Sequence, residues 1–344
     1  MSELKSVIAS TKSGAVRVDL PMPFGWFQVL YSAELAVGES QPLSYFGSDL
    51  VIFRTESGLV KVLDAYCPHM GAHLGYGIRD QAGGGSRVVG ESIVCPFHGW
   101  AFNGDGECTD IPYADKMPPR VARCEKVTLS WPVREANQCV YVWYHPQGVQ
   151  PLYEPPLIEE ASPENDAWGE LKIYEWDIDT HPQEIGENAV DAAHFRFVHG
   201  TPQVPEPTVM RFEDHCRFGL LESEMDTPRG RVKGRIENSS VGAGLSVVRF
   251  SGICETVLMA NLTPVEDGLT RAKYAFIQRA DAGASASRVG QAIIDDIRQQ
   301  MEEDRIIWAR KRYLEKPMLC DGDGPFAKFR RWYGQFLISD TAND

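Results

Sequence analysis

Two short stretches, Cys67-Pro-His69 and Cys95-Pro-Phe-His98, decide the fold expected for the first half of this 344-residue chain. Each stretch supplies one thiolate and one imidazole, and Gly71 and Gly99 follow them. Glycine lets a backbone take up turns that other residues resist and approach a bound group closely. Two cysteines and two histidines, paired one and one on two loops, can hold a [2Fe–2S] cluster in which the cysteines bind one iron and the histidines the other. The pattern therefore predicts an iron–sulfur site.

A structural zinc site is the main alternative for these four side chains, because two cysteines and two histidines are also a zinc set. Zinc sites usually pair cysteine with cysteine and histidine with histidine, whereas each pair here is mixed. The mixed pairs favour a cluster of the Rieske type. Rieske proteins of respiratory chains carry two further cysteines on these loops, where this chain has Ala72 and Phe97. The site is more similar to the clusters of ferredoxins and oxygenases.

Composition narrows the possible partners and the compartment. The net charge of −14 and the isoelectric point near 5.1 argue against a nucleic-acid or anionic-membrane partner. The first 20 residues lack the apolar core of a signal peptide, and no run of about 18 apolar residues predicts a membrane span. Eight cysteines without a secretion signal suit a reducing compartment. We therefore expect a cytoplasmic protein with no membrane span.

The chain is long enough for two domains, and its patterns predict an α+β fold. We expect an all-β cluster domain over 24–146, and over 147–344 a catalytic domain of the helix-grip type, an antiparallel sheet with helices. Residues 1–23 are expected to pack on the second domain. The expected strands of that domain cover 171–180, 208–224, 231–239, 246–262 and 270–279, and its expected helices cover 184–195 and 289–315. No glycine-rich dinucleotide fingerprint follows any strand, so electrons are expected from another protein.

A second group of polar side chains falls in the stretch that we expect to be the first helix. Asn188, Asp191 and His194 are spaced three residues apart and would share one helix face. His199 lies five residues after His194, beyond the expected helix end. Two histidines near a helix end can hold one metal ion with a third ligand from elsewhere. From the sequence alone, a structural histidine pair is an equally good interpretation.

The long C-terminal helix supplies a candidate for the third ligand. Ile297, Met301, Asp304 and Trp308 recur at helical spacing and form one apolar stripe that contains one aspartate. A buried carboxylate is costly unless it is paired or binds a metal, so either a metal or a buried arginine is expected beside it. Its neighbours 302 and 303, both glutamates, fall off the stripe and are expected to be solvated. Two histidines and one carboxylate leave open positions at a non-haem ferrous iron.

These residues together resemble the large oxygenase component of Rieske non-haem iron oxygenases, over nearly the whole chain. The C-terminal segments 304–308, 311–313, 321–325 and 330–336 look like the tail of 3-ketosteroid 9α-hydroxylase oxygenase subunits, and cholesterol 7-desaturases share much of that tail. The resemblance implies that Asp191 carries electrons between subunits, from the cluster ligand His98 of one to the iron ligand His194 of the next. Asn188 is a possible supporting residue. The implied ligands are Cys67, His69, Cys95 and His98 for the cluster, and His194, His199 and Asp304 for the iron.

The resemblance also implies a reaction and its partners. The implied assembly is a homotrimer. A separate reductase or ferredoxin, which itself draws electrons from NAD(P)H, would reduce it, and dioxygen would be the cosubstrate. The expected reaction is hydroxylation of an unactivated C–H bond of a steroid, at the 9α position of a 3-ketosteroid. Sterol desaturation, or oxygenation of another hydrophobic or aromatic substrate, is a second interpretation within enzymes. A Rieske electron carrier with an appended binding domain, and a zinc-stabilised interaction protein, are the interpretations outside them.

Overall fold

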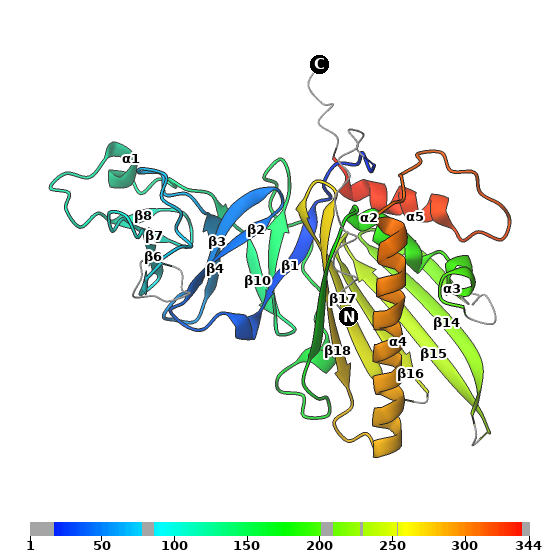
Figure 1. Ribbon diagram of the computed structural model, residues 1–344. Coiled ribbons are helices and arrows are strands. Elements are labelled where there is room, and N and C mark those ends of the chain that lie inside the picture. The colour runs from blue at the N-terminus through cyan, green and yellow to red at the C-terminus, as the bar shows by residue number, and fades with distance from the viewer. Residues whose placement is uncertain (1–16, 78–85, 201–208, 228–229, 253, 339–344) are drawn as a thin grey trace, which may run out of the picture.

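The computed structural model describes residues 17–77, 86–200, 209–227, 230–252 and 254–338, and Figure 1 draws the remainder as a thin trace. The first half is built from three small antiparallel sheets, ordered β1-β11-β10, β2-β3-β4-β9 and β5-β6-β7-β8. Their strands are β1 Gly25–Tyr31, β2 Ser40–Tyr45, β3 Ser48–Arg54, β4 Val60–Asp64, β5 Val88–Val89, β6 Ser92–Val94, β7 Ala101–Asn103, β8 Cys108–Asp110, β9 Ser130–Trp131, β10 Val133–Ala136 and β11 Cys139–Tyr144. One short helix, α1 Pro119–Ala122, and one 3₁₀ turn, Ser32–Glu34, complete it. Apart from this helix and this turn, the regular structure described in this half consists of strands, which confirms the prediction of a β-sheet domain.

The second half contains one seven-stranded antiparallel sheet, ordered β12-β18-β17-β16-β15-β14-β13. Its strands are β12 Lys172–Ile178, β13 Val209–Glu213, β14 Cys216–Thr227, β15 Gly230–Val241, β16 Leu245–Ser251, β17 Thr256–Glu266 and β18 Leu269–Gln278. The helices are α2 Pro182–Gly186, α3 Ala193–Phe197, α4 Ala284–Trp308 and α5 Phe326–Tyr333, with 3₁₀ turns at Glu159–Ala161, Glu187–Ala189 and Gly334–Phe336. Helix α4 lies across one face of the sheet (Figure 1), which confirms the predicted α+β fold.

The two faces of this large sheet pack against different partners. On one face, Val247 and Met259 join Phe27 of β1 in a single hydrophobic core that runs through both halves of the chain. On the other face, Leu258 and Phe276 pack with Ile294 of α4. Side chains alternate between faces along a strand, so each strand contributes to both layers. The sheet is thus held between the first half of the chain and the long helix.

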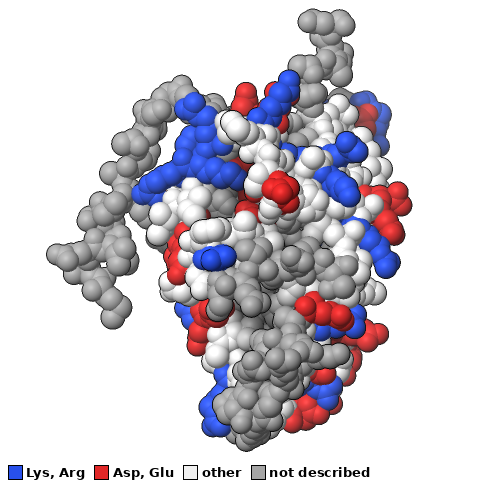
Figure 2. All heavy atoms as spheres, turned by 90° about the vertical axis from the view of Figure 1, so that its right-hand side faces the viewer, with Lys and Arg blue, Asp and Glu red and all other residues white. Residues whose placement is uncertain are grey.

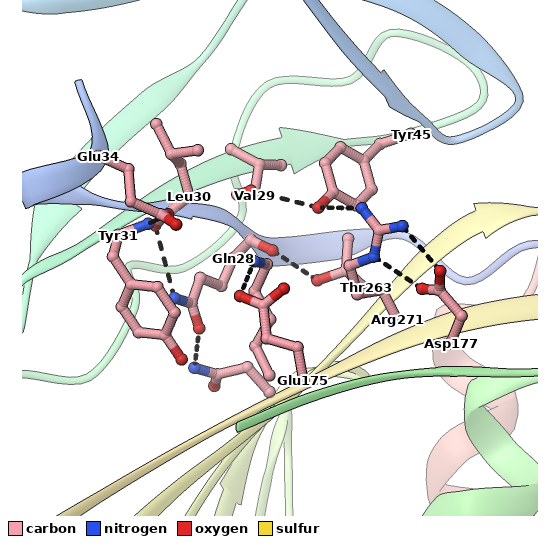
Figure 3. A network of polar contacts seen from close by, with 12 residues as sticks. Gln28, Val29, Leu30, Tyr31, Glu34, Tyr45, Glu175, Asp177, Thr263 and Arg271 are labelled. Carbon is pink, nitrogen blue, oxygen red and sulfur yellow. Dashed lines mark hydrogen bonds and ion pairs between the residues drawn. The ribbon is translucent and has the colours of Figure 1, made fainter. Parts of the chain in front are cut away.

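A buried polar network fixes the contact between the two halves (Figure 3). The fully buried Gln28 of β1 accepts a hydrogen bond from Asn261 Nδ2 at 2.6 Å, and its backbone carbonyl accepts one from Thr263 Oγ1 at 2.7 Å. Arg271 of β18 donates to the Tyr45 hydroxyl of β2 at 3.4 Å. Buried polar groups that are fully paired specify one arrangement, since an unpaired group would be costly. The network therefore holds the orientation of the two halves.

Several predicted elements of the second half have different boundaries. The expected strand over 208–224 is a hairpin, because Asp214 adopts a positive φ of 47° between β13 and β14. The expected strand over 246–262 is likewise two strands, β16 and β17, separated at Gly252 with φ of 114°. Helix α4 begins earlier than predicted and ends at Trp308 instead of running to residue 315. Helix α5, which follows Gly324 and Pro325, was not predicted.

The prediction of one helix over 184–195 is wrong. The stretch contains α2, the 3₁₀ turn Glu187–Ala189 and α3, and Val190 between them has φ of −122°. The Asp191 side chain accepts hydrogen bonds from the backbone N–H groups of Ala193 and His194, so it starts a new helix instead of continuing the old one. None of the described helices is long and apolar enough to cross a membrane.

The segment before β1 lies on the second half of the chain. Arg17 donates to the backbone carbonyls of Trp308 at 3.1 Å and Asp179 at 2.9 Å, and the Pro21 carbonyl contacts His181 Nε2 at 3.1 Å. Residues 1–16, which were expected to pack there too, lie outside the described residues.

Candidate metal centres

The two loops that carry the expected cluster ligands, residues 67–71 and 95–99, have the same backbone conformation. Gly71 N–H donates to the Cys67 carbonyl at 2.9 Å, and Gly99 N–H donates to the Cys95 carbonyl at 3.0 Å. Both glycines have positive φ, 74° and 75°, a conformation that side chains disfavour. Each loop thereby folds back on its cysteine and directs backbone N–H groups toward the sulfur. The donors are those of His69 and Met70 on one loop and those of Phe97 and His98 on the other.

The four expected cluster ligands lie together. The Cys67 and Cys95 side chains are buried and adjacent, and one shared hydrogen bond raises the pKa of Cys67 and lowers that of Cys95. The His69 and His98 rings are 4.8 Å apart between centroids, and His69 stacks on Trp100 at 4.5 Å. All eight cysteines of the chain are free.

A [2Fe–2S] cluster fits this set. His98 Nδ1 is buried and has no hydrogen-bond partner among the described residues, although buried polar atoms are nearly always paired. Two adjacent thiols supplied with backbone donors, together with the neighbouring imidazoles of His69 and His98, are the donor set that a Rieske cluster needs.

The second site brings together three side chains that are far apart in the sequence. His194 of α3, His199 just after α3, and Asp304 of α4 each offer one ligand atom, and these atoms all lie within 4.8 Å of one another. His199 is almost fully buried, with 2% of its side chain exposed, and its Nε2 lies 3.4 Å from Asp304 Oδ1. Burial raises the pKa of Asp304 although both histidines act to lower it.

Hydrogen bonds at Nδ1 orient both imidazoles of this site. His194 Nδ1 contacts the Asp191 carbonyl at 2.5 Å, and His199 Nδ1 contacts Glu303 Oε2 at 2.7 Å. These partners accept hydrogen bonds, which assigns the ring proton to Nδ1 and leaves the Nε2 lone pair of each ring free. His199 Nε2 is itself buried and without a hydrogen-bond partner. Two free imidazole lone pairs beside a buried carboxylate fit a divalent iron.

Glu303 is a residue whose role the sequence reasoning missed. We expected it to be solvated, but one carboxylate oxygen bonds to His199 and the other accepts from Gln299 Nε2 at 2.9 Å. Hydrogen bonds from Gln299 and from His199 lower the pKa of Glu303, so it stays ionised beside the ring. Its position directly before Asp304 is the one signal in the sequence that could have pointed to it.

Asn188 bonds to the Asp304 carboxylate, and the charge of that carboxylate also acts on Tyr274. Asn188 Nδ2 donates to Asp304 Oδ2 at 2.8 Å, so the supporting position expected for Asn188 agrees with its contact. Burial raises the pKa of Tyr274, and the charge of Asp304 raises it further. The alternative partner for Asp304, a buried arginine, is not among its contacts within the described residues.

Asp191 lies at the outer side of this site. Its Oδ1 accepts the backbone N–H of His194 at 3.3 Å, and its Oδ2 lies 3.8 Å from His194 Nδ1. Burial raises the pKa of the Asp191 carboxyl, but hydrogen bonds and charge from His194 outweigh that effect and lower it. About a quarter of the side chain, 27%, stays exposed. Asp191 thus contacts His194 while remaining reachable from outside the chain.

Within one chain the two candidate centres are far apart. Figure 1 shows the sheet that carries the Cys95 loop, β5-β6-β7-β8, at one end of the molecule and α3 at the other. Figure 2 turns the α3 end toward the viewer, where Lys and Arg side chains gather over the upper part of the face. The structure therefore does not bring Asp191 near His98 of the same chain.

The chain matches two known domain families. Residues 25–127 match the Rieske [2Fe-2S] domain, and residues 142–337 match the 3-ketosteroid 9alpha-hydroxylase C-terminal domain. The fold and the two sites define a Rieske non-haem iron oxygenase, which is an enzyme that uses a [2Fe–2S] cluster, mononuclear iron and dioxygen. The chain belongs to the family of these oxygenases that carry the 3-ketosteroid 9α-hydroxylase C-terminal domain.

Similar proteins include two kinds of steroid enzyme. A cholesterol 7-desaturase of Xenopus laevis is 33% identical over 93% of this chain and 72% of its own length. A probable 3-ketosteroid-9-alpha-monooxygenase oxygenase component of Rhodococcus rhodochrous is 32% identical, over 91% of this chain and 79% of its own. Among solved structures, dicamba monooxygenase has the same fold, with a TM-score of 0.70 at 18% identity, covering 91% of this chain and 96% of that one.

Proposed function

We propose that this chain is the oxygenase component of a multi-component monooxygenase that hydroxylates an unactivated C–H bond of a steroid, at the 9α position of a 3-ketosteroid. One observation carries the proposal: His194, His199 and Asp304 converge, with two imidazole lone pairs free, in a chain of this family. A separate reductase or ferredoxin would supply the electrons, because no dinucleotide fingerprint follows a strand.

In this proposal each centre has its own protein ligands. Cys67, His69, Cys95 and His98 would hold the cluster, and His194, His199 and Asp304 would hold the iron. When bound, these groups would supply single-electron transfer and activation of dioxygen. Glu303 orients His199, Asn188 orients Asp304, and the His199 side chain is itself almost fully buried. The boundary between the two domains would fall near residues 146 and 147.

Asp191 would connect the two centres across a subunit boundary. The centres lie at opposite ends of one chain (Figure 1), so a short path requires a neighbouring chain. In a closed head-to-tail trimer, Asp191 would bridge His194 of one chain to His98 of the next. Charge supports this contact: residues 24–146 carry 13 acidic and 9 basic side chains, and the α3 end presents a gathering of basic ones (Figure 2). The trimer would be cytoplasmic.

Sterol desaturation is the second candidate, favoured by the similarity to the Xenopus laevis cholesterol 7-desaturase. It needs the same ligands and differs in removing two hydrogens instead of inserting oxygen. Membership in an oxygenase family argues against both a simple electron carrier and a zinc-stabilised interaction protein.

A single turnover tests the proposal without the partner reductase. The purified protein, holding cluster and iron, would be reduced chemically and given oxygen with 4-androstene-3,17-dione or cholesterol. We expect the ketosteroid to gain one oxygen by mass spectrometry, with the label of ¹⁸O₂ in the product. A product lacking two hydrogens would support the desaturase instead. An unchanged ketosteroid and cholesterol would contradict both.

A further inference from the structure

Arg217 of β14 is a buried cation with most of its hydrogen-bonding capacity unused. Only 3% of the residue is exposed. Nη2 donates to Asn238 Oδ1 at 2.6 Å and to Ser240 Oγ at 3.0 Å. Nε and Nη1 are buried and have no partner among the described residues. Of the five N–H groups of a guanidinium, roughly three are therefore unpaired.

The side chain belongs to the face of the sheet that carries the candidate iron site. One residue from each of the strands β14 to β18 lies directly opposite the next, which forms a row across the sheet. In strand order this row is Arg217, Ser240, Ser246, Ala260 and Tyr274. Directly opposed residues of antiparallel strands point to the same face. Ala260 and Tyr274 pack in the hydrophobic group that includes Ile294 of α4. The charge of Asp304 raises the pKa of Tyr274, which places the two side chains in the same region. One row of the sheet thus connects Arg217 with the surroundings of Asp304.

The strand leaves room for the guanidinium. A side chain at Gly219, two residues along β14 on the same face, would come within 3.6 Å of Arg217 Nη1. Glycine inside a strand often marks a place where another group approaches closely. A Cβ at Gly219 would be in ordinary van der Waals contact with Nη1, so the glycine leaves the volume of one side chain unfilled beside the guanidinium.

Arg217 also has no counter-charge among the residues that the structure describes. Two other cations of the described residues have one: the buried Lys273 is paired with Glu175, and the partly buried Arg330 is paired with Glu187 at 2.6 Å. No ion pair of Arg217 occurs within the described residues, and burial lowers the pKa of its guanidinium to about 10. Burying a charge without a partner is costly, and truncating a true structural pair is strongly destabilising. A bound anion beside Arg217 would offset the free-energy cost of burying its charge.

We propose that Arg217 recognises a carboxylate on the substrate, so that the preferred substrate is a steroid acid whose carboxylate lies at Arg217 while its ring system extends toward the iron site. A neutral ketone would satisfy hydrogen-bond donors but would leave the charge uncompensated, whereas a carboxylate satisfies both. This inference rests on the proposed function and specifies its substrate class.

Binding of matched ligands tests it. The holoenzyme would be titrated calorimetrically with 3-oxo-4-androstene-17β-carboxylate, with its methyl ester and with 4-androstene-3,17-dione. The variants are Arg217→Met, Arg217→Lys and, as a control, Arg211→Met, an exposed arginine of the neighbouring β13. Thermal unfolding without ligand is measured for each.

We expect the wild type to bind the acid at least about tenfold more tightly than the ester, as a charge-assisted contact provides. Arg217→Met should lose this preference, Arg217→Lys should keep part of it, and Arg211→Met should keep all of it. Without ligand, Arg217→Met should unfold no earlier than the wild type. Equal binding of acid and ester by the wild type, a retained preference in Arg217→Met, or marked destabilisation of Arg217→Met would each overturn the proposal.

These outcomes are separable from those of the turnover experiment. A protein that hydroxylates the neutral ketosteroid but shows no preference for the acid would refute only the role of Arg217. A protein that binds the acid preferentially but converts no steroid would refute the proposed reaction, while the proposed role of Arg217 in binding a carboxylate would still stand.

Discussion

Glu303 provides the sharpest test of how the candidate iron site is built. Its Oε2 lies 2.7 Å from His199 Nδ1, and its Oε1 accepts from Gln299 Nε2 at 2.9 Å. The His199 side chain is only 2% exposed, whereas 34% of the Glu303 side chain is exposed, so the carboxylate bonds to the buried ring from its outer side. A carboxylate in this position fixes the orientation of the ring and makes Nε2 a stronger ligand.

We expect substitution of Glu303 to weaken iron binding in two graded steps. Glu303→Gln keeps an oxygen that can accept the His199 N–H but removes the charge, so the Kd for Fe(II) should rise about tenfold. Glu303→Ala removes the acceptor as well, and the increase should approach about 100-fold. The cluster loops lie in the other half of the chain and should be unaffected.

The assay is anaerobic competition for Fe(II) against a coloured chelator, with the visible spectrum of the cluster as an internal standard. Glu302→Gln is the matched control, because Glu302 is the adjacent residue of α4 and bonds to Trp176 and Arg305 instead. If Glu303→Gln bound Fe(II) as tightly as the wild type, or if Glu302→Gln weakened it equally, the orienting role of Glu303 would be refuted.

Three further expectations follow from the same geometry. Asp304→Ala should lose the mononuclear iron with the cluster spectrum preserved; iron retained in full would exclude Asp304 as a ligand. Asp191→Ala should keep both centres but turn over very slowly, because only the connection between subunits is lost; turnover at the wild-type rate in a single-turnover assay would rule out that connection. His181 is buried, its Nδ1 accepts the Gln183 N–H, and burial lowers its pKa from 6.5 to about 4. The unfolded chain therefore binds more protons between these values, so this contribution to stability is complete above about pH 6.5 and is lost as the pH falls toward 4, by about 3 kcal/mol in total. Urea unfolding from pH 4.5 to 7 should show a shallower dependence in His181→Asn, and an unchanged slope would contradict the assignment.

The cluster loops and the stripe on α4 could be predicted from sequence because each depends on local spacing. Mixed Cys-His pairs followed by glycine specify a loop without knowledge of the rest of the chain, and the structure places all four side chains together. Asp304 was recognisable because a carboxylate interrupts the apolar stripe of Met301 and Trp308, and all three are indeed buried.

Other features depend on contacts that sequence spacing does not contain. The region around Asp191 was predicted as one helix, but the Asp191 side chain begins a second one by bonding to the backbone N–H groups that follow it. The charged residue Glu187 is buried because Arg330, far along the chain, pairs with it at 2.6 Å. Arg217 belongs to no recognisable sequence motif, and its lack of a counter-charge among the described residues becomes visible only in the folded chain.

The most direct test of the whole account is the ratio of iron to acid-labile sulfide in the purified protein. Two centres predict about three irons for about two sulfides in each chain, with the third iron removed by a chelator while the cluster spectrum persists. A ratio of one iron to one sulfide, in protein supplied with Fe(II) and intact in its cluster, would contradict the claim that His194, His199 and Asp304 form an iron site.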